Sequence, residues 1–198
     1  MAMYELYTSF ALTCLAIELT PGPDMTYLAV LSAMHGRRAG FSAIVGIGLG
    51  LLLIGVAATF GAAAIISQYP SLYNALRWLG VVYMLWLAYD CWRVKEAGSV
   101  SLGRYEEARY FTRGLVTNLL NPKAALFYIS VLPTFTNPKI AFAQQSLPLV
   151  GLYVAIATSI HIVIVMLGAR AKPHLENSRM AQRARYFFTA LMVAIAIW

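Results

Sequence analysis

The sequence places three helix-breaking residues in a row, Pro21, Gly22 and Pro23, inside an apolar segment long enough to cross a bilayer. Proline lacks a backbone donor and clashes with the preceding turn, and glycine loosens the backbone, so a helix cannot run straight through this tripeptide. In hydrocarbon the freed backbone groups need partners from another helix or a cavity. Two carboxylates, Glu18 and Asp24, flank the break. The stretch therefore predicts a broken transmembrane helix that lines a binding site.

An alternative for these residues is a soluble loop in which Thr20 caps a helix that starts at Pro21. The composition argues against it. Hydrophobic residues make up 60% of the 198 residues, charged residues only 12%, and the mean hydropathy is +0.68. A soluble domain has roughly 25% charged residues. The chain is therefore predicted to be a membrane protein, with the lipid bilayer as a partner.

The formal net charge of +7 raises the question of nucleic-acid binding. The basic residues do not form a stripe with interleaved aromatic residues but stand in short linkers between apolar segments, so no nucleic acid is expected as a partner.

The two cysteines, Cys14 and Cys91, lie in apolar segments without a C-x-x-C partner. This favours packing roles over a disulfide or a metal site, and no cofactor is predicted.

Six apolar segments are expected to cross the membrane within a single transmembrane domain, residues 1–198. We place them roughly at 7–34, 41–67, 72–92, 113–134, 145–169 and 186–198. The region 93–112 is predicted to be a cytoplasmic loop with one short helix near 105–110. The last segment, with about a dozen residues, is shorter than the roughly 20 that a full span needs.

The fourth segment is predicted to be broken like the first, because its interior holds Asn118, Asn121, Pro122 and Lys123. A shift of 101 positions aligns the two breaks. Each half, roughly 1–92 and 113–198, contains three predicted spans, and an odd number of spans inverts the second half. The predicted fold is thus an all-α polytopic membrane protein with six transmembrane helices in two inverted three-helix repeats, of which helices 1 and 4 are broken.

The distribution of positive charge predicts the orientation. Of the 15 Lys and Arg residues, twelve stand in the linkers after the first, third and fifth segments when Arg113, at the edge of the fourth segment, is included, and only Lys139 stands in the linkers on the other side. The positive-inside rule places those three linkers in the cytoplasm, so both termini are expected on the periplasmic side.

Gly46 and Gly50 form a G-x-x-x-G pair, which predicts close helix packing within the chain or between protomers. A homodimer is a hypothesis that follows from this pair.

The motifs T-P-G-P-D at residues 20–24 and N-P-K at residues 121–123 resemble the signatures of the lysine/homoserine exporter superfamily (LysE/RhtB type). The resemblance covers essentially the whole chain in length and segment order, although the short sixth segment departs from the pattern. It implies a multi-pass protein of the bacterial inner membrane that is not an enzyme. It further implies a secondary exporter of amino acids or close derivatives, driven by proton antiport. The alternative is a cation or metal-ion exporter of similar architecture.

The implied substrate focuses attention on the polar residues of the broken segments. Acids near a break can accept an ammonium or carry a proton, and backbone N–H groups at the start of a half-helix can hold a carboxylate. The alternative for these acids is a purely structural role. The alternative for the lysine is a position at the membrane interface, and the alternative for the histidine is simple packing. The candidate substrate- and proton-binding residues are Glu18, Asp24, Asn118, Asn121, Lys123 and His161. The residues predicted to break the helices are Pro21, Gly22, Pro23 and Pro122.

Overall fold

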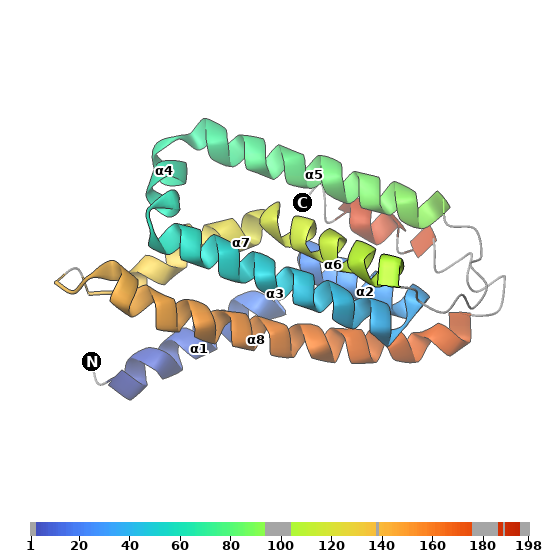
Figure 1. Cartoon of the computed structure of the whole chain (residues 1–198), viewed down its shortest axis with the longest axis horizontal. Helices are drawn as coiled ribbons and strands as arrows, with labels where there is room; N and C mark the ends of the chain where they lie inside the picture. The colour runs from blue at the N-terminus through green and yellow to red at the C-terminus, as the bar shows by residue number, and fades with distance from the viewer. Residues whose placement is uncertain (1–2, 94–103, 138, 176–185, 188, 195–198) are drawn as a thin grey trace.

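The computed structural model describes residues 3–93, 104–137, 139–175, 186–187 and 189–194, and within these ranges the chain is helical and contains no strand (Figure 1). The helices are α1 (Met3–Leu19), α2 (Pro23–His35), α3 (Arg37–Thr59), α4 (Ala62–Gln68), α5 (Pro70–Arg93), α6 (Arg104–Leu119), α7 (Pro122–Leu126) and α8 (Phe142–Ala171). A π-helical turn, Phe127–Val131, and a 3-10 turn, Leu132–Phe135, extend α7, and Lys172–Leu175 forms a 3-10 turn after α8.

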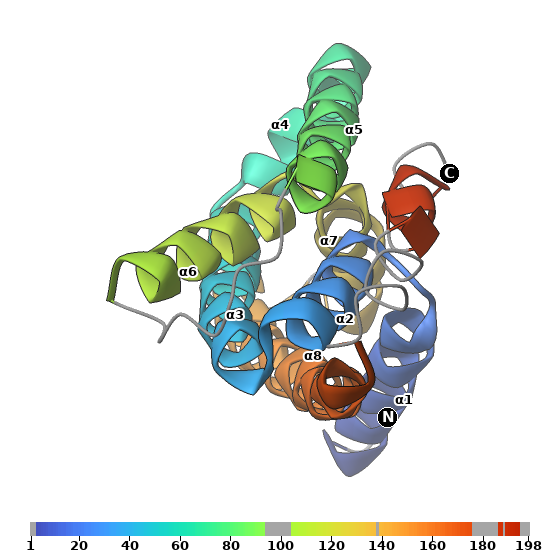
Figure 2. The same ribbon diagram turned by 90° about the vertical axis from the view of Figure 1, so that its right-hand side faces the viewer.

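Four helices surround the centre of the molecule. The end-on view shows α3 between α6 and α8, with α2 packed against both α3 and α8 (Figure 2). Helix α1 lies outside this group against α8, and α5 lies apart beyond α7. This arrangement brings α2, α7 and α8 around one point, where the breaks between helices are found.

Both predicted helix breaks are present. The first helix ends at Leu19 and α2 begins at Pro23, with Gly22 as an extended N-cap. Likewise α6 ends at Leu119, and α7 begins at Pro122. In each case a proline occupies the first helical turn, where its missing N–H costs nothing and its fixed φ suits the helix. The second break bends the path of the chain by 48°.

The structure corrects two predicted boundaries. Helix α6 begins at Arg104, so residues 104–112 of the expected loop are helical, and residues 94–103 lie outside the described part of the chain. Glu106 and Glu107 in its first turn favour a helix N-terminus electrostatically, which explains why this polar stretch is helical. The predicted span 41–67 is divided at Gly61, whose φ of 108° is left-handed and separates α3 from α4.

Two helices among the described residues, α3 and α8, are long and apolar enough to cross a membrane. The bent pair Tyr105–Leu119 and Pro122–Phe135 adds a third if it forms one span. The arrangement of six spans in two inverted repeats therefore stays a prediction. The sixth predicted segment is helical at 186–187 and 189–194, and its remaining residues lie outside the described ranges.

Helices α3 and α6 approach each other through glycines. A Cβ added to Gly46 would collide with the carbonyl oxygen of Phe111, and one added to Gly114 would collide with that of Ala43. Gly50 faces Asn118 on the same helix α6. The G-x-x-x-G pair thus packs within the chain. The homodimer that it suggested is not tested by these contacts.

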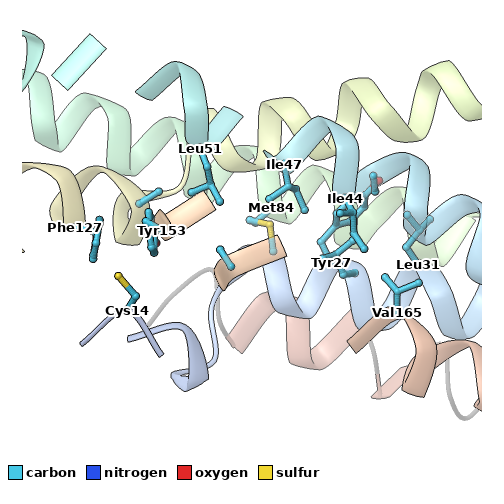
Figure 3. Close-up of a cluster of buried hydrophobic side chains, with 14 of the residues drawn as sticks. Cys14, Tyr27, Leu31, Ile44, Ile47, Leu51, Met84, Phe127, Tyr153 and Val165 are labelled. Carbon is cyan, nitrogen blue, oxygen red and sulfur yellow. The ribbon is translucent and has the colours of Figure 1, made fainter. Parts of the chain in front are cut away.

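Apolar side chains fill the space between the central helices. Figure 3 shows this buried cluster, which α1 enters with Cys14, α3 with Ile47 and Leu51, and α8 with Tyr153 and Val165. Burial of such side chains is the main stabilising contribution in most domains. Because Tyr153 is part of this packed cluster, its hydroxyl is held at a fixed height along α8, which matters for the site described next.

Candidate functional site

The site is built where the two helix breaks meet. Asp24, in the first turn of α2, is buried, and its Oδ2 accepts hydrogen bonds from two amides of the second break. Asn118 Nδ2 donates to it over 2.7 Å and Asn121 Nδ2 over 2.8 Å. The other oxygen, Oδ1, is buried without a hydrogen-bond partner in the described structure. One carboxylate oxygen is therefore fixed, and the other is available.

The contact is reciprocal, because Lys123 of α7 reaches back to the first break. Its ammonium donates to the carbonyl oxygen of Thr20 over 3.0 Å and lies 3.7 Å from Glu18 Oε1. Gly22 permits this approach, since a Cβ there would lie 3.3 Å from Lys123 Cδ. A cation beside the carbonyls at the C-terminal end of α1 is also favoured by the helix dipole. Each break thus supplies a polar group to the other.

Glu18 connects the breaks to α8. Tyr153 donates from its hydroxyl to Glu18 Oε1 over 2.7 Å, and His161 Nε2 lies 3.7 Å from Glu18 Oε2. The Tyr153 ring stacks on Phe127 with the ring centroids 3.8 Å apart. His161 Nε2 is buried and makes no hydrogen bond within the described structure. Glu18 therefore faces a hydroxyl donor and an imidazole of α8 in addition to the ammonium of Lys123.

Asn121 and Asn118 are themselves held in place by the backbone. Asn121 is the N-cap of α7, and its Oδ1 accepts from the Lys123 backbone N–H over 3.0 Å. This bond fixes the amide so that Nδ2 faces Asp24. Asn118 packs against Gly50 of α3, where a Cβ would lie 2.7 Å from Asn118 Oδ1. The missing side chain at Gly50 therefore makes the space that Asn118 occupies.

The charges of the buried cluster do not cancel. Glu18 and Asp24 are 4% and 6% exposed, and Lys123 is the one lysine beside them. With both carboxylates ionised and His161 neutral, one negative charge is left over. Burial of an uncompensated charge is costly, so the cluster favours binding a cation or a proton.

A small cavity lies inside this cluster. Its volume of about 10 Å³ is close to the minimum for one water molecule, so no amino acid fits without a rearrangement. The structure is therefore closed around the site. The cavity is lined by Glu18, Gly22, Asp24, Met25, Asn121, Lys123, Ala124 and Tyr153.

All six residues that the sequence singles out as binding candidates lie in this one cluster, although their binding roles are not tested by the geometry. Sequence reasoning missed Tyr153 and the Thr20 carbonyl. A signal for Tyr153 exists, because it precedes His161 by eight residues and thus lies on the same face of one helix. Among the described residues, no three His, Cys, Asp or Glu side chains are grouped to hold a metal ion.

Residues 15–198 match the sequence profile of the LysE type translocator. The chain belongs to the LysE type translocator family. Membership makes this LysE-type protein a membrane transporter and not an enzyme.

Curated relatives agree with this assignment. The chain is 28% identical over 173 residues to a homoserine/homoserine lactone efflux protein of Salmonella typhi, covering 83% of this chain and 79% of that protein. It is 34% identical over 124 residues to a leucine efflux protein of Enterobacter sp. (strain 638), and the match covers 61% of this chain and 59% of that protein. An uncharacterized membrane protein of Pseudomonas aeruginosa is 25% identical over 200 residues, and the match covers 96% of this chain and 93% of that protein. No solved structure matches this LysE-type chain. Together these findings support an amino-acid exporter.

Proposed function

We propose that this LysE-type protein exports amino acids or close derivatives from the bacterial cytoplasm by proton antiport, and that the buried cluster between the two helix breaks binds the substrate ammonium. The observation that carries the proposal is Asp24. Its Oδ1 lacks a partner in the described structure, Asp24 lines the cavity, and the lining contains two carboxyl groups, Glu18 and Asp24, and one lysine, Lys123. A substrate ammonium supplies both the missing hydrogen bond and the missing positive charge.

The names of the relatives favour the ammonium as the group that is recognised. Homoserine, homoserine lactone and leucine all carry an α-ammonium, whereas the carboxyl group of the lactone is closed into a ring ester. The ammonium is therefore the charged group that the substrates named for the two relatives share, and we infer that the site in this chain recognises it. For substrates with a free carboxylate, the N-terminus of α2 has no side-chain cap and offers backbone N–H groups. These names do not favour the metal-ion alternative.

The closed cavity implies that transport requires movement of the broken helices. The two breaks contact each other through side chains of Asp24 and Lys123, so separating them would open the site. The proline-ended half-helices are suited to rigid-body motion about the breaks. We further propose the bacterial inner membrane as the location, with the Arg- and Lys-rich linkers in the cytoplasm and both termini in the periplasm.

The test is amino-acid efflux from bacterial cells that are preloaded with dipeptides. Wild-type protein is compared with Asp24→Asn, which keeps the shape of the side chain and removes its charge. We expect the wild type to release one or a few amino acids and the variant to lose at least about tenfold of that rate, since a hydrogen bond to a charged group is worth roughly that factor.

A matched control is Glu107→Gln, the same chemical change at an exposed position of α6. It should export at the wild-type rate, and membrane levels of all three proteins should be equal. Release of no amino acid by the wild type across a broad panel would refute the proposed function. Unchanged release by the Asp24 variant would remove Asp24 from the site while leaving the exporter assignment intact.

A further inference from the structure

The geometry points to Lys123 as a tethered competitor of the substrate: we propose that its ammonium pairs with Asp24 whenever Glu18 is protonated, and that it leaves Asp24 to the substrate whenever Glu18 is ionised. This inference rests on the proposed function. It assigns different roles to the two buried carboxylates and explains how one proton excludes one substrate from the site.

The surroundings of the two carboxylates differ in chemistry. Asp24 accepts hydrogen bonds from the amides of Asn118 and Asn121, which stabilise its ionised form and carry no charge of their own. Glu18 contacts the hydroxyl of Tyr153 and lies close to the ammonium of Lys123 and the imidazole of His161. Because Lys123 is a cation, its contact with Glu18 is strong when Glu18 is ionised and is lost when a proton neutralises Glu18.

Lys123 stands between these two acids. Its ammonium lies 3.7 Å from Glu18 Oε1, and its side chain lines the same cavity as Asp24. The four-carbon stem of lysine is flexible, so the ammonium can be redirected by rotation of its side chain. When a proton neutralises Glu18, the remaining ionised partner in the cavity is Asp24, whose Oδ1 is unpartnered. The lysine then occupies the position that a substrate ammonium would take.

The charges of the side chains and of the substrate ammonium balance in both states, and a free substrate carboxylate is held separately by the N-terminus of α2. With Glu18 protonated, Lys123 and Asp24 neutralise each other, and the site has no charge left to attract an ammonium. With Glu18 ionised, Lys123 pairs with Glu18, and Asp24 accepts the substrate ammonium. The proton enters from the periplasm, displaces the substrate there, and leaves Glu18 on the cytoplasmic side before the next substrate binds. The titratable groups that face Glu18 from its own helix and from its neighbours are Cys14, Asp24, Lys123, Tyr128, Tyr153 and His161.

The test is a double substitution assayed in proteoliposomes, with L-leucine, L-homoserine and homoserine lactone as probes. Exchange of labelled for unlabelled probe needs no proton cycle, whereas uphill export driven by a pH gradient does. Glu18→Gln imitates the protonated acid, so we expect exchange to fall about tenfold, the factor expected for competition by one charge-assisted hydrogen bond. Glu18→Gln combined with Lys123→Gln leaves Asp24 without its competitor, and exchange should recover most of that loss. Neither variant should respond to the pH gradient.

Recovery is the decisive result, because two substitutions in a purely structural cluster would add their damage. Exchange by the double variant at or below the level of Glu18→Gln would overturn the inference. An absence of exchange by wild type with every probe would instead refute the proposed function, so the two failures are distinguishable.

A second measurement applies if the Glu18 variants do not reach the membrane. Exchange by wild type should decline as the pH is lowered, whereas exchange by Lys123→Gln should not. Lys139→Gln, at an exposed position, is the matched control and should follow the wild type. Parallel pH profiles for wild type and Lys123→Gln would also overturn the inference.

Discussion

Substitution of Gly50 by alanine tests whether the space on α3 positions the site. The new Cβ would lie 2.7 Å from Asn118 Oδ1 and 3.0 Å from Asn118 Cβ. The second distance matters more, since Cβ is fixed to the backbone of α6 and cannot rotate away. Asn118 must therefore move together with α6, and its 2.7 Å hydrogen bond to Asp24 is lost.

The expected magnitudes have two parts, packing and the hydrogen bond. Crowding in a packed interior costs about 1–3 kcal/mol, and replacing glycine by alanine within a helix returns about 1 kcal/mol. Packing alone therefore lowers folding stability by about 0–2 kcal/mol. A hydrogen bond to a charged group contributes roughly 1.5–3 kcal/mol, or about ten- to a hundredfold in an equilibrium constant, so its disruption at Asp24 lowers substrate binding by up to that factor and adds to the loss of folding stability.

The assay combines thermal unfolding of the purified protein with amino-acid export from preloaded cells. Gly48→Ala is the matched control, because its Cβ would meet Thr158 Oγ1 at an ordinary 3.6 Å. We expect Gly48→Ala to export normally and to be slightly stabilised, and Gly50→Ala to export at about a tenth of the wild-type rate or less with a similar membrane level. Wild-type export by Gly50→Ala, or equal impairment of both variants, would refute the reasoning.

Two other substitutions test the supports of the site and of α5. Asn121→Ala removes the N-cap of α7 together with a donor to Asp24. The midpoint of thermal unfolding should therefore fall by an amount that corresponds to about 2–4 kcal/mol, and export should be lost. An unchanged midpoint would contradict this assignment. Asp90→Asn removes the ion pairs to Arg109 at 3.3 Å and Arg113 at 2.7 Å, which are partly exposed. It should therefore cost less than about 1 kcal/mol in the same measurement and leave export unchanged, and a larger loss would show that α5 depends on this contact.

The breaks could be predicted because their cause is local. Pro21, Gly22, Pro23 and Pro122 dictate where a helix must stop, whatever surrounds them. The meeting of five of the six candidate residues followed from aligning the two breaks, so it too was accessible from the sequence. His161 was selected only for its depth in the fifth segment, and that alignment did not place it in the cluster. The proton and substrate roles assigned to these residues stay predictions.

The features that sequence reasoning missed depend on packing or on weak local preferences. The start of α6 at Arg104 lies in a polar stretch whose charge pattern is compatible with both a loop and an amphipathic helix. The turn at Gly61 interrupts a segment that is apolar throughout. Tyr153 reaches Glu18 across 135 positions of sequence, and its spacing from His161 places it on the same face of α8 without specifying that this face meets α1.

The exchange of polar groups between the two breaks also constrains how this protein is made. Asp24 is synthesised 94 residues before Asn118 and 97 before Asn121, and the Thr20 carbonyl 103 residues before Lys123. At a synthesis rate of about 5–20 residues per second, the partners of the first break are synthesised about 5–20 s after it. During biosynthesis the first half must therefore keep its carboxylates in contact with water, with the insertion machinery or with lipid headgroups, and it can bury them only after the second half has arrived.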